Sequence, residues 1–199
     1  HHHKDVYFHA LWQIRNRKDK FKDTSTIERF FIISTIILRM LMPSFWIRHF
    51  CEGRKNTKEL FELYVIFKPI FFTVVLAAWW YHYNLIAGIT IYFLLDFLLY
   101  IVGILILSDI FSKPVNVRKW LILLGMNYRE IILWFAILYL HFDAISLNHP
   151  NRTSQAVEAV YYSISAFSTV GFGDVIVTNN IGIAISIVQL IVSIIFVGI

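Results

Sequence analysis

The sequence is poor in charge and nearly free of cysteine, and both shortages limit what it can be. Lys, Arg, Asp and Glu make up 16% of its 199 residues, whereas 58% are hydrophobic. Soluble domains carry about 25% charged residues. The single cysteine, Cys51, excludes an intrachain disulfide. The long uncharged runs predict an integral membrane protein.

The patterns that mark common enzymes and cofactor-binding proteins are also missing. The sequence has no P-loop, no metal-ligand spacing, no nucleophile constellation and no internal repeat. A membrane enzyme would need polar groups that converge within its spans, and only Lys68 and Asp96 qualify. We therefore expect neither an enzyme nor a bound cofactor.

The positive charge is distributed as in a membrane protein. A net charge of +5 could indicate a nucleic-acid partner. The Lys and Arg residues instead gather in the segments that flank apolar runs, which favours a lipid bilayer and no nucleic acid. His1 to His3 are interpreted as the remnant of a purification tag.

Five apolar segments follow the basic start of the chain. They are residues 27–47, 60–83, 85–107, 128–145 and 181–199. Arg39 and Pro43 interrupt the first segment, which predicts either a span or a helix that lies along the inner interface. The second ends in a Trp-Trp-Tyr-His-Tyr cluster that is typical of an interfacial aromatic belt. The last four segments predict spans.

Lys68 and Asp96 lie inside the hairpin that the second and third segments would form. Counted from the turn at Asn84, Asp96 is 12 residues away and Lys68 is 16. At about 1.5 Å per residue, their depths differ by roughly 6 Å. Because unpaired charges within a membrane are costly, we predict that the two residues pair. The alternative is that Lys68 snorkels to the inner interface alone.

The strongest functional pattern is the stretch 169–174, Thr-Val-Gly-Phe-Gly-Asp. Gly171 and Gly173 can take positive φ at little steric cost. This freedom allows successive backbone carbonyls to be aimed at one axis.

A short helix is predicted just before this stretch, over residues 155–167. Thr153 or Ser154 can cap its start. Glu158 lies in its first turn, where a negative charge interacts favourably with the positive end of the helix dipole. The long apolar segment 181–199 follows the stretch.

This order of elements and the six-residue pattern resemble the pore of tetrameric potassium channels, with the filter in its GFG form. The resemblance covers residues 128–199 and implies an outer helix, a pore helix, a selectivity filter and an inner helix. In such filters, rings of backbone carbonyls replace the hydration shell of K⁺. One chain supplies one filter strand, so the resemblance implies a homotetramer that conducts K⁺. A prokaryotic source is expected.

The resemblance also implies roles for particular residues. The K⁺-coordinating filter comprises Thr169, Val170, Gly171, Phe172 and Gly173, with the ion sites at the first four. Asp174 stands at the outer mouth. Ser193 and Gly198 are candidates for the hinge of the inner helix.

Two departures from the family pattern concern the support of the filter. Tyr161 and Tyr162 stand where voltage-gated relatives carry a tryptophan pair. Phe172 has no hydroxyl, so any brace from the filter to Tyr162 must be by packing. Ser165 stands where some relatives carry a carboxylate that pairs with the filter aspartate. Tyr161 is therefore the expected partner of Asp174.

Orientation follows from the outward-opening filter of this family. If residues 27–47 lie at the interface, the cytoplasmic segments hold six Lys and Arg at 4–22, five at 39–58 and four at 113–129, out of 18 in all. The positive-inside rule then favours four spans, a cytoplasmic N-terminus and a multi-pass location in the cell membrane.

The expected fold is thus an all-α integral membrane protein, with two peripheral transmembrane helices and a pore module. Its parts are the tag remnant 1–3, a cytoplasmic tail with an interfacial helix at 4–59, the transmembrane hairpin 60–112, a basic cytoplasmic linker at 113–127 and the pore domain 128–199. A helix over 181–199 covers roughly 28 Å. We expect it to continue past Ile199, where a cytoplasmic regulatory domain can follow.

A voltage sensor of the S4 type is not expected. Lys113, Arg118 and Lys119 do not share the three-residue spacing of gating charges, and the uncharged stretch 120–126 is too short to span.

Two other functions stay open. A weakly selective cation channel is disfavoured by the intact Thr-Val-Gly-Phe-Gly, and a K⁺ uptake carrier subunit would have four pore repeats.

Overall fold

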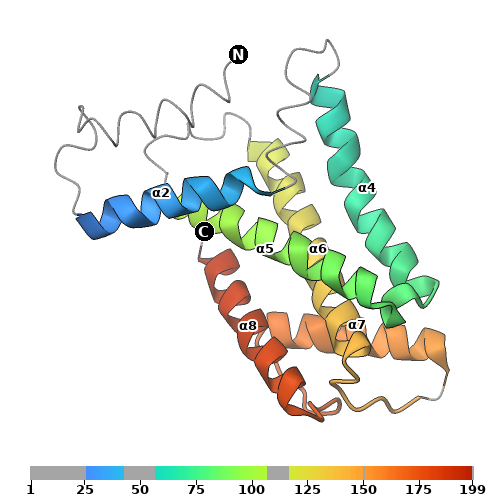
Figure 1. Cartoon of the computed structure of the whole chain (residues 1–199). Coiled ribbons are helices and arrows are strands. Elements are labelled where there is room, and N and C mark those ends of the chain that lie inside the picture. Colours follow the sequence, from blue (N-terminus) through green and yellow to red (C-terminus); the bar gives the residue numbers. More distant parts are fainter. Residues whose placement is uncertain (1–25, 43–56, 107–116, 150, 199) are drawn as a thin grey trace. The chain divides into compact units, whose positions relative to one another are not determined.

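The computed structural model of the chain describes residues 26–42, 57–106, 117–149 and 151–198 (Figure 1). The predicted tail and the links at 43–56 and 107–116 lie outside the described residues. Two units make up the chain: His1–Leu63 with Asp96–Lys113, and Tyr64–Leu95 with Pro114–Ile199. The described residues form helices and loops with one isolated β-bridge, which confirms the expected all-α class.

The first unit contains helix α2, Thr26–Met40. Ile32 and Ile36 are buried, whereas Phe30 and Phe31 on the same helix are exposed. At about 1.5 Å per residue the helix is shorter than a bilayer core. The predicted segment 27–47 is therefore helical over its first part, and its position at the interface stays a prediction.

Helices α4, Thr57–Ala77, and α5, Asn84–Ile106, form the predicted hairpin, with the short 3-10 helix η2, Trp80–His82, between them. The predicted span 60–83 ends early, because the chain leaves the helix at Ala77 and Trp79 takes a left-handed φ of 60°. The apolar part of α4, Leu63–Ala77, is shorter than a typical span. By length and composition, three described helices can cross a membrane: Asn84–Gly103, Leu121–His141 and Asn180–Val197.

Helix α6, Val117–His141, begins within the predicted linker 113–127. The helix begins eleven residues before position 128 and ends four residues before 145. The apolar stretch 120–126 is too short to span alone, but the helix continues through Asn127, Arg129 and Glu130 into the next apolar run. The side chains from Ile131 to Leu140 are all buried. A helix that is buried on every side forms the centre of its unit.

The hairpin of α4 and α5 packs on α6 through aromatic rings in the second unit. Phe72 on α4 contacts Phe93 on α5 and Trp134 on α6 edge-on, with centroids 5.7 and 5.9 Å apart. At the end of the hairpin, the ring nitrogen Nδ1 of His141 lies 2.7 Å from the carbonyl oxygen of Tyr81. These contacts join α4 and α5 to the outer helix.

Helices α7, Arg152–Phe167, and α8, Asn180–Val197, complete the second unit, with α7 running crosswise to α6 and α8 (Figure 1). Asn151 caps α7 by accepting a hydrogen bond from the Thr153 amide, so neither Thr153 nor Ser154 is the cap. The helix starts earlier than predicted, which moves Glu158 out of its first turn. Glu158 instead accepts a hydrogen bond from the Asn148 amide at 3.0 Å and pairs with His149.

The start of α8 is fixed against the loop that follows α6. Asn179 caps α8 at the Gly182 amide, 2.7 Å away, and its side-chain amide donates to the carbonyl of Phe142 at 3.0 Å. A Cβ on Gly182 would lie 2.6 Å from the carbonyl oxygen of Ala144 and 2.6 Å from Cγ1 of Val177. Only a glycine permits this close approach.

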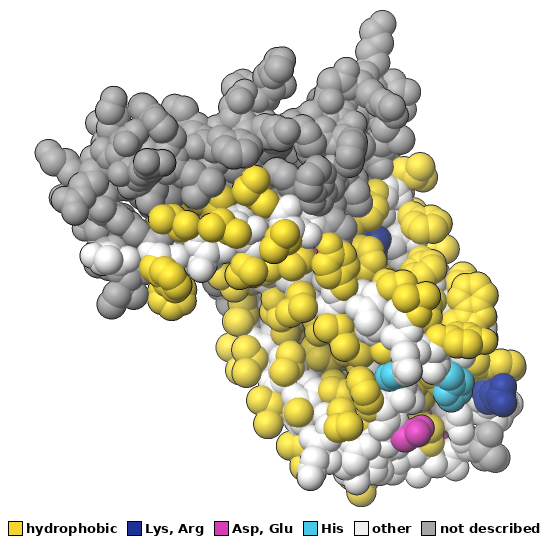
Figure 2. All heavy atoms as spheres, in the orientation of Figure 1, with side chains coloured by type: hydrophobic (Ala, Val, Ile, Leu, Met, Phe, Trp, Pro, Cys, Tyr) yellow, Lys and Arg dark blue, Asp and Glu magenta, His cyan; other side chains and the backbone are white. Residues whose placement is uncertain are grey.

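The described surface is predominantly apolar. Figure 2 shows hydrophobic side chains over most of the described face, with few charged or histidine side chains in view, most of them together at the lower right. Exposed large hydrophobic side chains occur on every long helix. Such a surface belongs in lipid or against other apolar surfaces.

We predict that Gly182→Ala destabilises the protein, because the new methyl group must displace backbone at Ala144. The free energy of unfolding should fall by about 1–3 kcal/mol, measured by denaturation in detergent micelles. Gly125→Ala is the matched control, since a Cβ at Gly125 meets nothing within 4 Å. Equal stability of the two variants would contradict the close packing at Gly182.

Candidate functional site

The loop between α7 and α8 has an alternating backbone. Thr169, Gly171 and Gly173 have positive φ of 59°, 58° and 80°, whereas the two residues between them do not. Such an alternation of positive and negative φ allows like backbone groups of successive residues to line one side of the loop. A left-handed threonine is strained by about 1–3 kcal/mol, and such strain persists only where the surroundings enforce it.

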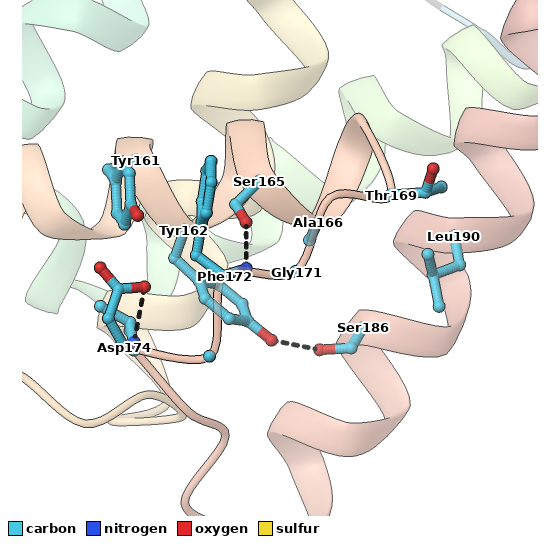
Figure 3. Close-up of a pocket in the computed structure, with 12 residues that line it drawn as sticks. Tyr161, Tyr162, Ser165, Ala166, Thr169, Gly171, Phe172, Asp174, Ser186 and Leu190 are labelled. Carbon is cyan, nitrogen blue, oxygen red and sulfur yellow. Dashed lines mark hydrogen bonds between the residues drawn. The ribbon is translucent and has the colours of Figure 1, made fainter.

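Ser165 on α7 holds this loop by its backbone and its side chain. Its carbonyl oxygen accepts a hydrogen bond from the Val170 amide at 3.1 Å, and its hydroxyl accepts one from the Phe172 amide at 3.4 Å (Figure 3). The Thr169 amide donates to the carbonyl of Ala166 at 3.2 Å. The last turn of α7 therefore fixes the start and middle of the loop.

Tyr161 lies close enough to Asp174 for the carboxylate to act on its hydroxyl, and the pairing of the two residues stays a prediction. The nearby Asp174 carboxylate raises the pKa of the Tyr161 hydroxyl above its usual value. The Tyr161 ring also stacks on Phe172, with centroids 6.0 Å apart and planes 11° from parallel. Tyr161 therefore contacts the loop by packing on Phe172.

Tyr162 points away from Asp174, toward α8. Its hydroxyl lies 3.3 Å from the hydroxyl of Ser186, and its ring meets Tyr139 of α6 edge-on (Figure 3). Tyr162, Phe172 and Ser186 line a cavity of about 250 Å³ behind the loop. The structure therefore gives Tyr162 a polar link to α8.

The outer end of the loop is tied to the chain that follows α6. The Ser146 amide donates to the carbonyl of Ile176 at 2.8 Å, and the Thr178 amide donates to that of Ala144 at 3.0 Å. The Asp174 carboxylate accepts a hydrogen bond from the Val175 amide at 3.1 Å. Both ends of the loop are thus held by rigid elements.

The two hinge candidates lie in different surroundings on α8. Ser193 is buried, and its hydroxyl donates to the carbonyl of Phe167 at the end of α7. Gly198 is exposed and caps α8, with its amide 3.0 Å from the carbonyl of Ile194. A hinge role for either residue stays a prediction.

The structure gives Lys68 a partner that the sequence did not predict. Its ammonium lies 2.8 Å from a carboxylate oxygen of Glu130 on α6, and only 1% of the Glu130 side chain is exposed. The rings of Tyr64, Phe93 and Trp134 lie within 5.0, 6.0 and 5.9 Å of the ammonium. Asp96 is a buried residue of the other unit, so its pairing with Lys68 stays a prediction. Sequence reasoning missed Glu130, because position 130 fell near the expected start of the outer helix.

Buried polar residues on α8 and its neighbours were also missed. Gln189 is fully buried and bonds with Tyr139 of α6 and Ser163 of α7. The available signal was a glutamine within an otherwise apolar span, since such residues face a protein interior and find partners.

The groups able to bind an ion at this site are backbone oxygens. Within the described ranges, no three His, Cys, Asp or Glu side chains gather as metal ligands. The loop instead offers the carbonyls of consecutive residues, with a single carboxylate, Asp174, at its outer end. Backbone carbonyls of this kind are better suited to an ion that moves through the site than to an ion that stays bound.

A comparison with protein-family models gives one assignment for this region. Residues 128–199 match a family described as "Ion channel". No curated protein and no solved structure matches the chain. The matched residues include most of α6 and all of α7, the loop and α8.

Proposed function

We propose that the protein is a K⁺-selective channel of a cell membrane, because residues 128–199 match an ion-channel family. The observation that carries the proposal is the backbone of Thr-Val-Gly-Phe-Gly, with positive φ at Thr169, Gly171 and Gly173. Carbonyls aligned in this way can replace the water shell of K⁺. No organic cofactor is needed, since the ion is the substrate that passes through.

A pore requires four copies of the chain in this proposal. One loop contributes oxygens from one side only, whereas an ion must be surrounded. Val170 and Phe172 are 54% and 66% exposed in the single chain, and Ile187, Ile191 and Ile194 of α8 are more than half exposed. These apolar side chains are available to pack against neighbouring copies and lipid, which supports a homotetramer.

Strong selectivity is favoured over weak selectivity by how firmly the loop is held. Ser165 accepts hydrogen bonds from three loop amides, those of Val170, Gly171 and Phe172, and Tyr161 stacks on Phe172. A loop fixed at both ends resists collapse around the smaller Na⁺. The distribution of Lys and Arg supports a cytoplasmic N-terminus with the loop opening outward.

We predict that the protein in lipid vesicles passes K⁺ well over Na⁺ and is blocked by Ba²⁺. Gly171→Ala should abolish the K⁺ flux, because an L-residue at φ 58° is strained. Gly88→Ala is the control, since Gly88 is helical and a Cβ there has open space. Bi-ionic recordings with equal K⁺ and Na⁺ permeability would contradict the proposal.

We also propose that the channel is not opened by an S4-type voltage sensor. Arg118 and Lys119 are adjacent on α6 and do not share the spacing of gating charges. Moving one charge through the membrane yields about 2.3 kcal/mol per 100 mV, so steep opening needs several.

The open probability measured against voltage in symmetric KCl should therefore be shallow. It should stay so when Arg118 and Lys119 are both replaced by Gln. A steep curve of several elementary charges that flattens in this double variant would show voltage sensing by α6.

A further inference from the structure

Besides the contact of Tyr162 with Ser186, two hydrogen-bonded contacts join the inner helix α8 to the helix α7 that precedes the filter. Gln189 and Ser193 are one turn apart on α8, and their partners Ser163 and Phe167 are one turn apart on α7. Both contacts therefore join residues that lie 26 positions apart in the chain. The two helices are held in register along the second half of α7.

The first contact uses both ends of the Gln189 amide. Its Nε2 group donates to the carbonyl and the hydroxyl of Ser163 at 2.8 and 3.0 Å, and its Oε1 accepts from the Tyr139 hydroxyl at 2.7 Å. The Ser163 hydroxyl in turn donates to the carbonyl of Ile132 at 3.0 Å. Gln189 thus joins α6, α7 and α8 at one buried point.

The second contact lies where α7 becomes the filter. The last four carbonyls of a helix have no partner within the helix and need others. At the end of α7, the carbonyl of Ser165 accepts from the filter amide of Val170, whereas that of Phe167 accepts from the Ser193 hydroxyl. Carbonyls two residues apart therefore serve the filter and the inner helix.

We propose that Gln189 and Ser193 are positioning residues for the filter. They hold the last turn of α7 at the place from which Ser165 bonds the amides of Val170 and Phe172. A displacement of α8 at this level is passed directly to the filter backbone. The inference rests on the proposed function only in naming the loop 169–173 an ion filter.

Chemistry favours a role in position over a role in folding alone. A fully buried amide in an apolar span is costly unless its donors and acceptor are all used. An apolar side chain would fill the same volume without that requirement. Gln189 and Ser193 instead form directional hydrogen bonds. Such bonds fix how far one helix is shifted along the other, whereas apolar packing restricts that shift less.

The test compares Ser193→Val with Ser193→Thr in the full chain reconstituted in lipid nanodiscs. Both substitutions add similar bulk, and only Thr keeps a hydroxyl for the Phe167 carbonyl. Hydrogen exchange of the Val170 and Phe172 amides, measured on peptides that cover 165–175, should be about tenfold faster in Ser193→Val than in Ser193→Thr, as for the loss of one buried hydrogen bond. Gln189→Met should accelerate the same amides.

Thr90→Val is the matched control for the loss of a buried hydroxyl. Thr90 is fully buried, and its hydroxyl bonds to the carbonyl of Ile86 within α5, away from the filter. This variant should leave the filter amides at the wild-type rate. If the added bulk prevents assembly of both Ser193 variants, Ser193→Ala removes the hydroxyl without added volume and is compared with wild type.

Equal exchange in Ser193→Val and Ser193→Thr, or a wild-type rate in Ser193→Ala and Gln189→Met, would overturn the inference. In parallel, the Na⁺-to-K⁺ permeability ratio should rise in Ser193→Val and be restored in Ser193→Thr. A wild-type protein without K⁺ selectivity would remove the proposed function. The exchange rates would still decide whether these residues position the loop.

Discussion

The structure depends on one backbone constraint, the alternation of positive and negative φ across residues 169–173. Gly171 and Gly173 adopt positive φ at little steric cost, whereas Thr169 adopts it with backbone strain. A strained loop keeps its shape only when other contacts fix it. The two-point bonding by Ser165, the stacking of Tyr161 on Phe172 and the pairing of 144–146 with 176–178 supply those contacts.

The other elements of the second unit form the frame for this loop. The buried helix α6 carries α7 through Ser163 and α8 through Tyr139, and it receives the outer hairpin through Trp134 and the ion pair of Lys68 with Glu130. A buried ion pair contributes little net stability beside apolar packing, but it fixes which residues face each other. The hairpin is thereby aligned with the outer helix at the depth of Glu130.

Much of the loop was predictable from sequence because its chemistry is local: positive φ at Gly171 and Gly173 follows from the residue type alone. The all-α class and the start of α8 followed equally from the long apolar runs, whereas the end of α8 at Val197 did not. The start of α6 could not be predicted in this way, because Arg118 and Lys119 made the first turns of the helix resemble a polar linker. The partners of Lys68 and Gln189 depend on which helices become neighbours in space, and no local pattern encodes that choice. The cap at Asn151 was missed because several adjacent polar residues could each have capped α7.

The most direct measurement of the central claim is the position of the ion itself. Crystals of the protein grown with Rb⁺ in place of K⁺ would reveal the ion by its anomalous scattering. The account predicts a row of peaks on a fourfold axis, each surrounded by oxygens from residues 169–173 of four chains. Ion peaks located away from these oxygens, or an assembly in which the four loops do not face a common axis, would contradict it.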